Sequence, residues 1–309
     1  MIAWSTEKGK ERWLMGRIKK LIRNLNYLSK HSLWDQREED IVYLTNKILD
    51  DGIYEYGIEI NSKTCYHILN AEDSLSLLER YPKSFVRTSD GEVKLMSGID
   101  QPFQKYEKEI ADSLIKSISI KREDMYVGIN RNYFISLMDS EGRKSYYRRH
   151  GYDHRTVYKK YLNFDITYLD ADFTAYPLGQ PQNEKYNKRF ERWRNLFKDK
   201  CLVIICGKGI LDEYSYDVFG LAKEKIIVDG PRVNGWNEKN RLLSQITRYD
   251  KKIYTVIFIL GMAGKAMIPI LTDEGYMCWD VGHLAKYYNA YMSGHGGTEE
   301  EIRKFYAPD

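Results

Sequence analysis

Unbroken apolar runs alternate with segments of helical periodicity along most of the chain. Such runs are expected for strands that are covered on both faces of a sheet. We predict strands at Ser84–Thr88, Met125–Ile129, Leu202–Cys206, Ile226–Val228, Tyr254–Leu260 and Met277–Trp279. Between them, apolar residues recur every three or four positions, as in helices; examples are Ile110, Leu114 and Ile118, or Tyr186, Phe190, Trp193 and Phe197. The alternation predicts an α/β fold with a mostly parallel sheet flanked by helices.

The first 60 or so residues follow a helical pattern without strands. One predicted helix has an apolar face formed by Ile18, Leu21, Ile22, Leu25 and Leu28, and a basic face formed by Lys19, Lys20 and Arg23. A basic amphipathic helix suits peripheral association with an anionic membrane. Packing of its apolar face on the main domain is the interpretation we favour. We predict a helical N-terminal extension at 1–65 and one larger domain at 66–309.

Composition narrows the class of protein. The 309 residues are 43% hydrophobic, enough for a full core, and the net charge of +4 is too small to favour a nucleic-acid-binding protein. The four cysteines show no paired metal-binding spacing. No signal peptide is visible, and the longest apolar run, Ile253–Leu260, has the length of a strand. We therefore expect a cytoplasmic protein with reduced thiols.

In open α/β sheets, ligands bind beyond the carboxyl ends of the strands. The loops that follow the predicted strands are therefore the candidate ligand-binding loops. The loop after the first predicted strand contains Asp90-Gly91-Glu92. Two carboxylates flanking a glycine would face one point, and Mg²⁺ or Mn²⁺ prefers carboxylate and phosphate oxygens. An ordinary turn explains the same three residues, so the motif alone is weak.

Two later loops combine glycines, an acid and a histidine. Gly261 and Gly264 follow a strand and open a predicted helix, where a nucleotide could approach the backbone; tight packing of helix on strand is the alternative. Asp280 and His283 follow the last predicted strand, where either would serve as a base or remain structural.

Basic and amide side chains follow the remaining strands. Lys208 would neutralise phosphate, although a solvated loop lysine is the interpretation we favour for this residue in isolation. Asn234 lies in the loop after Val228. The segment Arg148–Arg155 would clamp a pyrophosphate, although a solvated face is the interpretation we favour.

Taken in order, these loops resemble the bacterial GT-D-type glycosyltransferase family over roughly residues 70–292. The family stretch Phe-Val-Arg-x-Gly-Asp-Gly-Glu is matched by Phe85–Glu92. Its later Leu-Gly, Gly-Tyr and Asp-Ile-Gly-His elements are matched by Leu260–Gly261, Gly275–Tyr276 and Asp280–His283, and its Pro-x-x-Asn-Ala element by Pro231–Gly235.

The resemblance implies a Rossmann-like, metal-dependent transferase that uses a nucleoside-diphosphate sugar. It implies Mn²⁺ or Mg²⁺ held by the Asp-x-Glu motif at Asp90 and Glu92, directly or through water, and a UDP-sugar as donor. Arg87, Gly91, Lys208, Asn234, Gly261 and Gly264 are the expected nucleotide-binding residues. The expected acceptor is a glycan or a lipid-linked sugar of bacterial surface polysaccharide or glycoprotein synthesis, with no nucleic acid bound.

The chain departs from the family at two places. Ser89 replaces the glycine before the aspartate, and Leu284–Tyr288 lacks the carboxylates that family members often carry after the histidine. Asp280 and His283 are therefore the catalytic bases we predict. The alternatives are a non-catalytic nucleotide-sugar-binding or scaffold module of a polysaccharide assembly complex, and a different nucleotide-dependent enzyme of Rossmann type, against which the missing GxGxxG spacing argues.

Overall fold

The computed structural model describes residues 19, 22, 33–55, 66–134, 141–176, 178, 181–294 and 298–305. The chain divides into two compact units, 1–58 and 59–309, and each is described by itself. The first contains helix α2, Leu33–Glu55. Apart from Lys19 and Ile22, the basic amphipathic helix expected near the N-terminus lies outside the described residues. No helix among the described residues combines the length and apolar character needed to cross a membrane.

The second unit is built on one sheet of eight strands among the described residues, in the order β1-β4-β3-β2-β8-β7-β5-β6. Its strand pairs are all parallel, which confirms the predicted α/β class. The strands are β1 His67–Ile68, β2 Ser84–Thr88, β3 Met125–Ile129, β4 Thr167–Asp170, β5 Cys201–Gly207, β6 Glu224–Gly230, β7 Tyr254–Ile259 and β8 Met277–Asp280.

All six predicted strands are present, and two further strands, β1 and β4, were not predicted. β4 has only four residues and carries a threonine at its start and an aspartate at its end, so it lacks a long apolar run. β1 has two residues and pairs with β4 alone. Strands this short form because a neighbouring strand is already in place, which local sequence does not encode.

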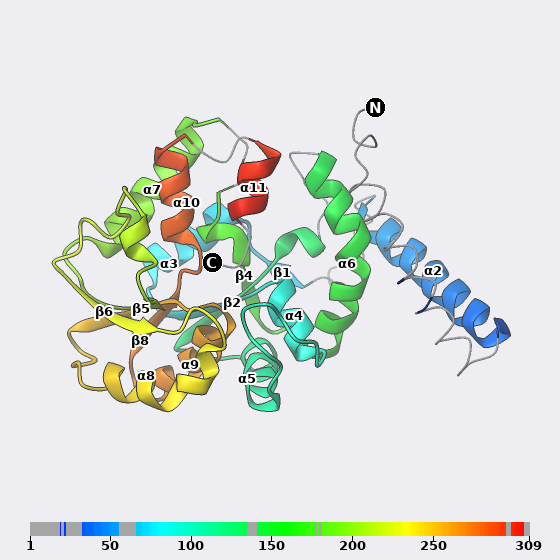
Figure 1. The fold of residues 1–309 in the computed structure, drawn as a ribbon, viewed down its shortest axis with the longest axis horizontal. Helices are drawn as coiled ribbons and strands as arrows, with labels where there is room; N and C mark the ends of the chain where they lie inside the picture. The colour runs from blue at the N-terminus through cyan, green and yellow to red at the C-terminus, as the bar shows by residue number, and fades with distance from the viewer. Residues whose placement is uncertain are drawn as a thin grey trace. The chain divides into compact units, whose positions relative to one another are not determined.

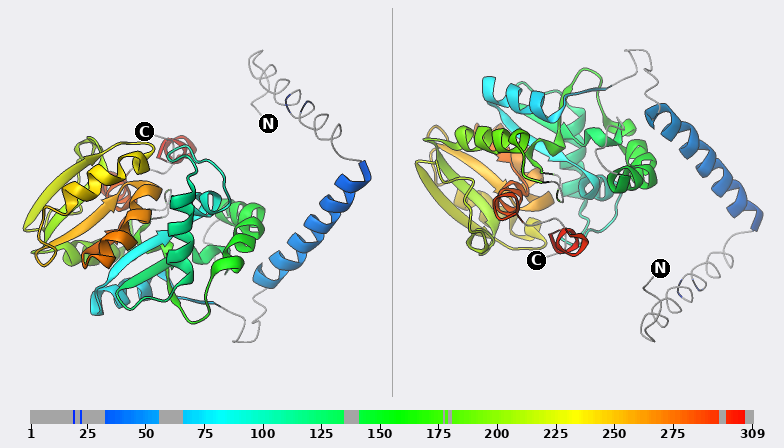
Figure 2. Two further views of the ribbon diagram at one scale, coloured as in Figure 1. Left: turned by 90° about the horizontal axis from the view of Figure 1, so that it is seen from below. Right: turned by 90° about the horizontal axis from the view of Figure 1, so that it is seen from above.

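Helices cover both faces of the sheet (Figures 1 and 2). The elements are α3 Ala71–Arg80, α4 Asp90–Met96, α5 Lys108–Ser119, α6 Glu141–Tyr161, α7 Glu184–Phe197, α8 Lys239–Ile246, α9 Gly261–Asp273, α10 Leu284–Met292 and α11 Glu299–Phe305, with 3₁₀ turns η1 Arg131–Tyr133, η2 Ala171–Thr174, η3 Leu211–Glu213 and η4 Gly235–Glu238. One face carries α3, α7 and α10, and the other carries α5, α8 and α9.

The alternation of side chains along the strands sets these two faces. Phe85 and Trp279, paired neighbours on β2 and β8, point into an aromatic core with Trp193 of α7. Phe258 of β7 points the other way, against α9 at Gly264. Trp193 is fully buried and donates its indole N–H to the Phe173 carbonyl oxygen. Burial of each such large side chain contributes about 1.5–3 kcal/mol.

Candidate active site

The carboxyl ends of β2 and β8 lie side by side, and the chain leaves them toward opposite faces. The segment after β2 enters α4, which packs with α5, whereas the segment after β8 enters α10 in the aromatic core. Ligands of open α/β sheets bind where neighbouring strands diverge in this way. The structure therefore brings together the loops after Thr88 and Asp280 that the sequence singled out.

Arg87, near the end of β2, joins this point to the end of β4. Its backbone N–H and its Nη2 atom donate to the two carboxylate oxygens of Asp280, at 3.1 and 3.2 Å, and its Nε donates to the Asp280 carbonyl oxygen at 2.8 Å. Its Nη1 donates to the Ala171 carbonyl oxygen and to Thr174 Oγ1. Arg87 was predicted to bind the nucleotide, but in this structure these N–H groups donate to protein oxygens. Asp280 is held in a buried ion pair with Arg87.

Gly282 leaves the space that the Arg87 guanidinium occupies. A Cβ atom on Gly282 would lie 2.0 Å from Arg87 Nη2. The backbone of Gly282 also has a φ of +51°, where side chains other than glycine are strained. The absence of a side chain at Gly282 therefore leaves room for Arg87 to pair with Asp280.

Glu92 belongs to the first turn of a helix rather than to a free loop, since α4 begins at Asp90. Its Oε2 accepts the Ser89 backbone N–H at 2.7 Å, and its Oε1 accepts the ammonium of Lys265 at 2.6 Å. Lys265 Nζ also lies 4.0 Å from Asp280 Oδ2. Glu92, Lys265 and Asp280 are 3%, 9% and 2% exposed, so this charge cluster is buried.

The predicted site for a divalent cation at Asp90 and Glu92 is limited by the hydrogen bonds that Glu92 already makes. Divalent cations need several oxygen ligands, and both oxygens of Glu92 already bind protein donors. Asp90 is half-buried at the start of α4. Within the described residues, no three His, Cys, Asp or Glu side chains gather as a metal cluster would require. With Lys265 in place, Glu92 does not fit a direct metal ligand, and binding of Mn²⁺ or Mg²⁺ stays a prediction.

His283 lies just after the Asp280 loop and is exposed to solvent. Its ring is near Tyr287 and Phe305, with ring centroids 6.3 and 6.2 Å away. Although the residue retains exposed surface, the protein around its ring desolvates the imidazole, and this desolvation, together with the positive charges of Lys286 and Arg87, lowers the pKa of His283 to about 4. The imidazole is therefore neutral at pH 7 and able to accept a proton.

A buried acid at the end of β4 was not predicted from the sequence. Asp170 is 7% exposed and accepts the backbone N–H of Asp172 at 3.0 Å. Burial and the negative charge of Asp172 raise the pKa of Asp170 to about 7. The adjoining residues Ala171 and Thr174 bind Arg87, which places Asp170 in the same connected region. The Asp-Ala-Asp pattern at 170–172 was the available signal, but its strand was missed.

His154 of α6 was also missed, because the Arg148–Arg155 segment was interpreted as a solvated face. His154 and Arg155 are each 4% exposed, so that interpretation is wrong for these two residues. His154 Nδ1 lies 2.7 Å from the His150 carbonyl oxygen, and its Nε2 has no hydrogen-bond partner among the described residues. Burial lowers the pKa of His154, while the negative charge of Asp90 acts in the opposite direction.

The three predicted nucleotide-binding glycines differ in their surroundings. Gly261 has a φ of +55° and open space where a side chain would stand, so its backbone is accessible. A Cβ atom on Gly264 would lie 2.9 Å from Phe258 Cδ1, so Gly264 serves the packing of α9 on β7. A Cβ atom on Gly91 would lie 2.5 Å from Met262 Cε, so Gly91 lies against the end of the Met262 side chain of α9.

Lys208 and Asn234 lie beyond the ends of β5 and β6. Lys208 is exposed, and its backbone N–H donates to the Gly230 carbonyl oxygen. Asn234 has a φ of +52° and is bonded to the segment after α4: its N–H donates to the Phe103 carbonyl oxygen, and its Oδ1 accepts the Lys105 N–H at 2.9 Å. In this structure, the Asn234 amide oxygen thus accepts a hydrogen bond from the loop between α4 and α5.

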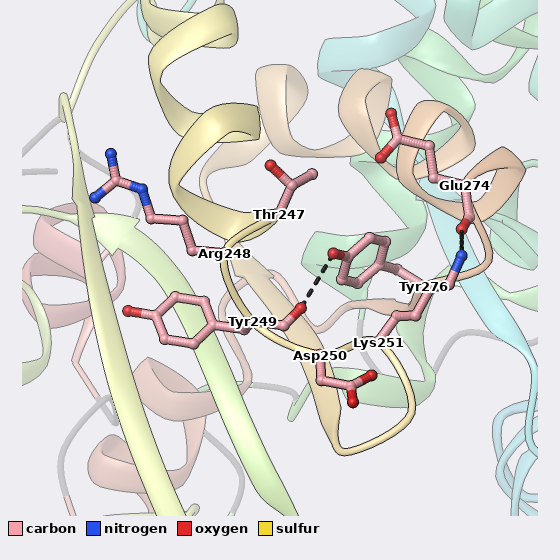
Figure 3. A pocket seen from close by; sticks show the side chains of 7 residues that line it. All are labelled: Thr247, Arg248, Tyr249, Asp250, Lys251, Glu274 and Tyr276. Atoms are coloured by element: carbon pink, nitrogen blue, oxygen red, sulfur yellow. Dashed lines mark hydrogen bonds between the residues drawn. The ribbon is translucent and has the colours of Figure 1, made fainter.

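A pocket of about 580 Å³ lies at the opposite edge of the sheet (Figure 3). It is lined by Thr247, Arg248, Tyr249, Asp250, Lys251, Glu274 and Tyr276, which precede β7 and β8. Lys251 Nζ donates to the Glu274 carbonyl oxygen, and Tyr276 Oη donates to the Tyr249 carbonyl oxygen. None of the predicted site residues lines this pocket, so it does not bear on the candidate site.

Comparison with known proteins gives one family match and two curated relatives. The family model described as glycosyltransferase GT-D fold matches residues 85–303. A probable glycosyl transferase Gly from Streptococcus gordonii is 24% identical over 258 residues, which cover 80% of this chain and 36% of that protein. Glycosyltransferase GlyD from Streptococcus pneumoniae serotype 4 is 23% identical over 226 residues, which cover 72% of this chain and 27% of that protein. The chain spans about a third of the length of the first relative and about a quarter of the second.

Solved structures share the fold. A structure described as the highly conserved domain of unknown function 1792, with a distinct glycosyltransferase fold, superposes with a TM-score of 0.69 at 22% identity, covering 82% of this chain and 86% of that one. A second, described as a new glycosyltransferase (DUF1792) from Streptococcus sanguinis, gives a TM-score of 0.68 at 20% identity and covers 75% and 87% of the two chains.

Proposed function

Because the chain belongs to the glycosyltransferase GT-D fold family, we propose that it transfers a sugar from a nucleoside-diphosphate sugar, a UDP-sugar in our prediction, to a hydroxyl of an acceptor glycan or lipid-linked sugar. The observation that supports this most directly is the convergence of the end of β8 with the helices that follow β2 and β7. They contribute Glu92, Lys265 and Asp280 to one buried charge cluster where β2 and β8 diverge.

On the donor side, the exposed backbone at Gly261 offers a place for the diphosphate. α9 begins there, and the N–H groups of a helix N-terminus favour an anion. Arg87 and Asp280 hold the ends of the strands in place and do not themselves need to contact the donor. A divalent cation bound with the donor would rely on Asp90 and the donor phosphates; no step below depends on it.

On the acceptor side, the hydroxyl must lose its proton as it attacks the anomeric carbon. Asp280 is enclosed by Arg87, with Lys265 nearby, whereas His283 is exposed and neutral at pH 7. We assign the proton-accepting role to His283, with Asp280 orienting the loop that carries it. Asp170, with a pKa of about 7, is the second group suited to proton transfer at this edge.

Binding and turnover of nucleotide sugars test the proposal. UDP-, GDP- and dTDP-sugars are added to the full chain, with and without Mn²⁺, and the melting temperature is followed. A ligand that binds only the folded state raises that temperature. Release of the nucleoside diphosphate is then measured for the donors that bind. No shift and no release with any nucleotide sugar would refute the transferase and leave the non-catalytic scaffold as the better interpretation.

A further inference from the structure

A lysine ammonium lies between the acidic loops of the proposed active site. Lys265 Nζ is 2.6 Å from Glu92 Oε1 and 4.0 Å from Asp280 Oδ2. The side chain of Lys265 is 11% exposed, those of Glu92 and Asp280 5% and 3%. Burying a charge is costly unless it is paired, so the Lys265 ammonium is held at this position by the two carboxylates.

The helix that carries Lys265 directs it toward the ligand-binding edge of the sheet. Lys265 lies four residues after Gly261 on α9, so the two share a helix face. Side chains on a helix lean toward its N-terminus, which brings the ammonium to the carboxyl ends of the strands. Gly261 has open space at that end. An anion reaching the backbone of Gly261 would meet a positive charge that belongs to the protein.

Counted together with Arg87, the charges of the cluster balance without a metal ion. Arg87 pairs with Asp280, and Lys265 pairs with Glu92 and lies 4.0 Å from Asp280. The four groups therefore carry two positive and two negative charges. A magnesium ion on Glu92 would sit about 2.0–2.1 Å from its carboxylate oxygen. It would therefore compete with the ammonium that already lies 2.6 Å from Oε1 and would repel it.

We propose that Lys265 is the cation that stabilises the departing nucleoside diphosphate, and that donor binding and transfer need no divalent metal. The inference rests on the function proposed above. As the acceptor oxygen bonds to the anomeric carbon, the bond from that carbon to the diphosphate oxygen breaks, and its electron pair stays on the diphosphate. The acceptor proton passes to His283. Lys265 keeps its proton throughout and pairs with the charge that develops on the leaving group.

The first experiment measures UDP binding to the full chain by calorimetry, in EDTA and in Mn²⁺. The wild type is expected to bind UDP with the same affinity in both. The variant Lys265→Met combined with Glu92→Gln removes both partners and avoids an unpaired buried charge, so it should keep the fold. Loss of a charged hydrogen bond should weaken its UDP binding in EDTA by about tenfold or more. Lys116→Met, on the exposed face of α5, is the control and should bind as the wild type does.

The second experiment asks directly whether Lys265 keeps a divalent cation away from Glu92. Bound and free Mn²⁺ are distinguished by electron paramagnetic resonance, without nucleotide. The wild type and Lys116→Met should retain no stoichiometric Mn²⁺. Lys265→Met frees Glu92 and should gain one bound Mn²⁺, which the addition of Glu92→Gln removes again. If Lys265→Met does not fold, the wild type alone still tests the proposal, because stoichiometric Mn²⁺ on the wild type would contradict it.

Three results would overturn the proposal: UDP binding to the wild type that requires Mn²⁺, UDP binding in EDTA that the double variant keeps in full, or stoichiometric Mn²⁺ on the wild type that Glu92→Gln abolishes. Failure of the transferase assignment is a separate outcome. In that case the wild type binds no nucleoside diphosphate under any condition, while the Mn²⁺ measurement still reports whether Lys265 excludes a cation from Glu92.

Discussion

Gly282 lies so close to the Arg87 guanidinium that position 282 has no room for a side chain. A Cβ atom on Gly282 would lie 2.0 Å from Nη2 and 3.1 Å from Cζ of the Arg87 guanidinium. That guanidinium pairs with Asp280 and donates to Ala171 and Thr174. Three strand ends, those of β2, β4 and β8, therefore depend on the absence of a side chain at position 282.

Gly282→Ala should destabilise the protein and lower turnover. The positive φ alone costs about 1–3 kcal/mol for a residue other than glycine, and the clash should also move Arg87 away from Asp280. Chemical denaturation and donor turnover measure the two effects. Gly98→Ala is the matched control, because Gly98 has a φ of +79° but nothing within 4 Å of a Cβ atom. Equal losses in both variants would show that the contact with Arg87 is unimportant.

Arg87→Met should cost about 3–5 kcal/mol in the free energy of unfolding, since it leaves the buried Asp280 carboxylate without its partner. The measurement is urea denaturation at constant pH. Arg232→Met removes an exposed arginine whose pair with Glu213, at 2.6 Å, should contribute about 1 kcal/mol or less. A similar cost for the two variants would contradict the structural role assigned to Arg87.

Stability should fall with rising pH because of Asp170. In the unfolded chain this carboxyl titrates near pH 4, but its pKa in the folded protein is raised to about 7. Between these values the folded state retains a proton that the unfolded state releases, so the free energy of unfolding falls from about pH 4 to about pH 7 and levels off above. Asp170→Asn should remove this decline, which amounts to at most about 4 kcal/mol. Asp165→Asn, at an exposed site, controls for the loss of one carboxylate; an unchanged decline in Asp170→Asn would refute the prediction.

The pH–rate profile should distinguish the two candidate bases. Since the pKa of His283 is lowered to about 4, kcat/KM should be constant at neutral pH and fall only in acid, near pH 4. His283→Gln should lower kcat by about 10²–10⁴-fold. A fall of kcat/KM below pH 7 instead, absent in Asp170→Asn, would assign the proton transfer to Asp170.

The sheet was largely predictable because its central strands are continuous apolar runs. Ser84–Thr88 and Met125–Ile129 were predicted to the residue, and the prediction for β7 was one residue too long at Leu260. Asp90–Glu92 was expected to form a loop, yet it opens a helix, because the Glu92 carboxylate accepts the Ser89 N–H. That contact is local, and the Ser-x-x-Glu spacing of a helix N-terminus was its signal.

The partners inside the site were not predictable in the same way. Arg87 and Asp280 are 193 residues apart, and their contact follows from the parallel pairing of β2 with β8. Lys265 lies within an otherwise apolar part of α9, where nothing in the sequence indicates that its ammonium reaches Glu92, 173 residues away. Sequence periodicity locates strand ends, whereas the pairing of charges depends on which ends become neighbours.

The order of strands has a consequence for synthesis on the ribosome. β8 is the last strand to be made, yet it lies in the middle of the sheet, between β2 and β7. Until it emerges, β2 and β7 lack the strand that lies between them in the folded sheet, and unpaired strand edges invite association with other chains. Insertion of β8 closes both edges and delivers Asp280 to Arg87 in the same event. Acquisition of the charge cluster and protection from aggregation are therefore one folding step.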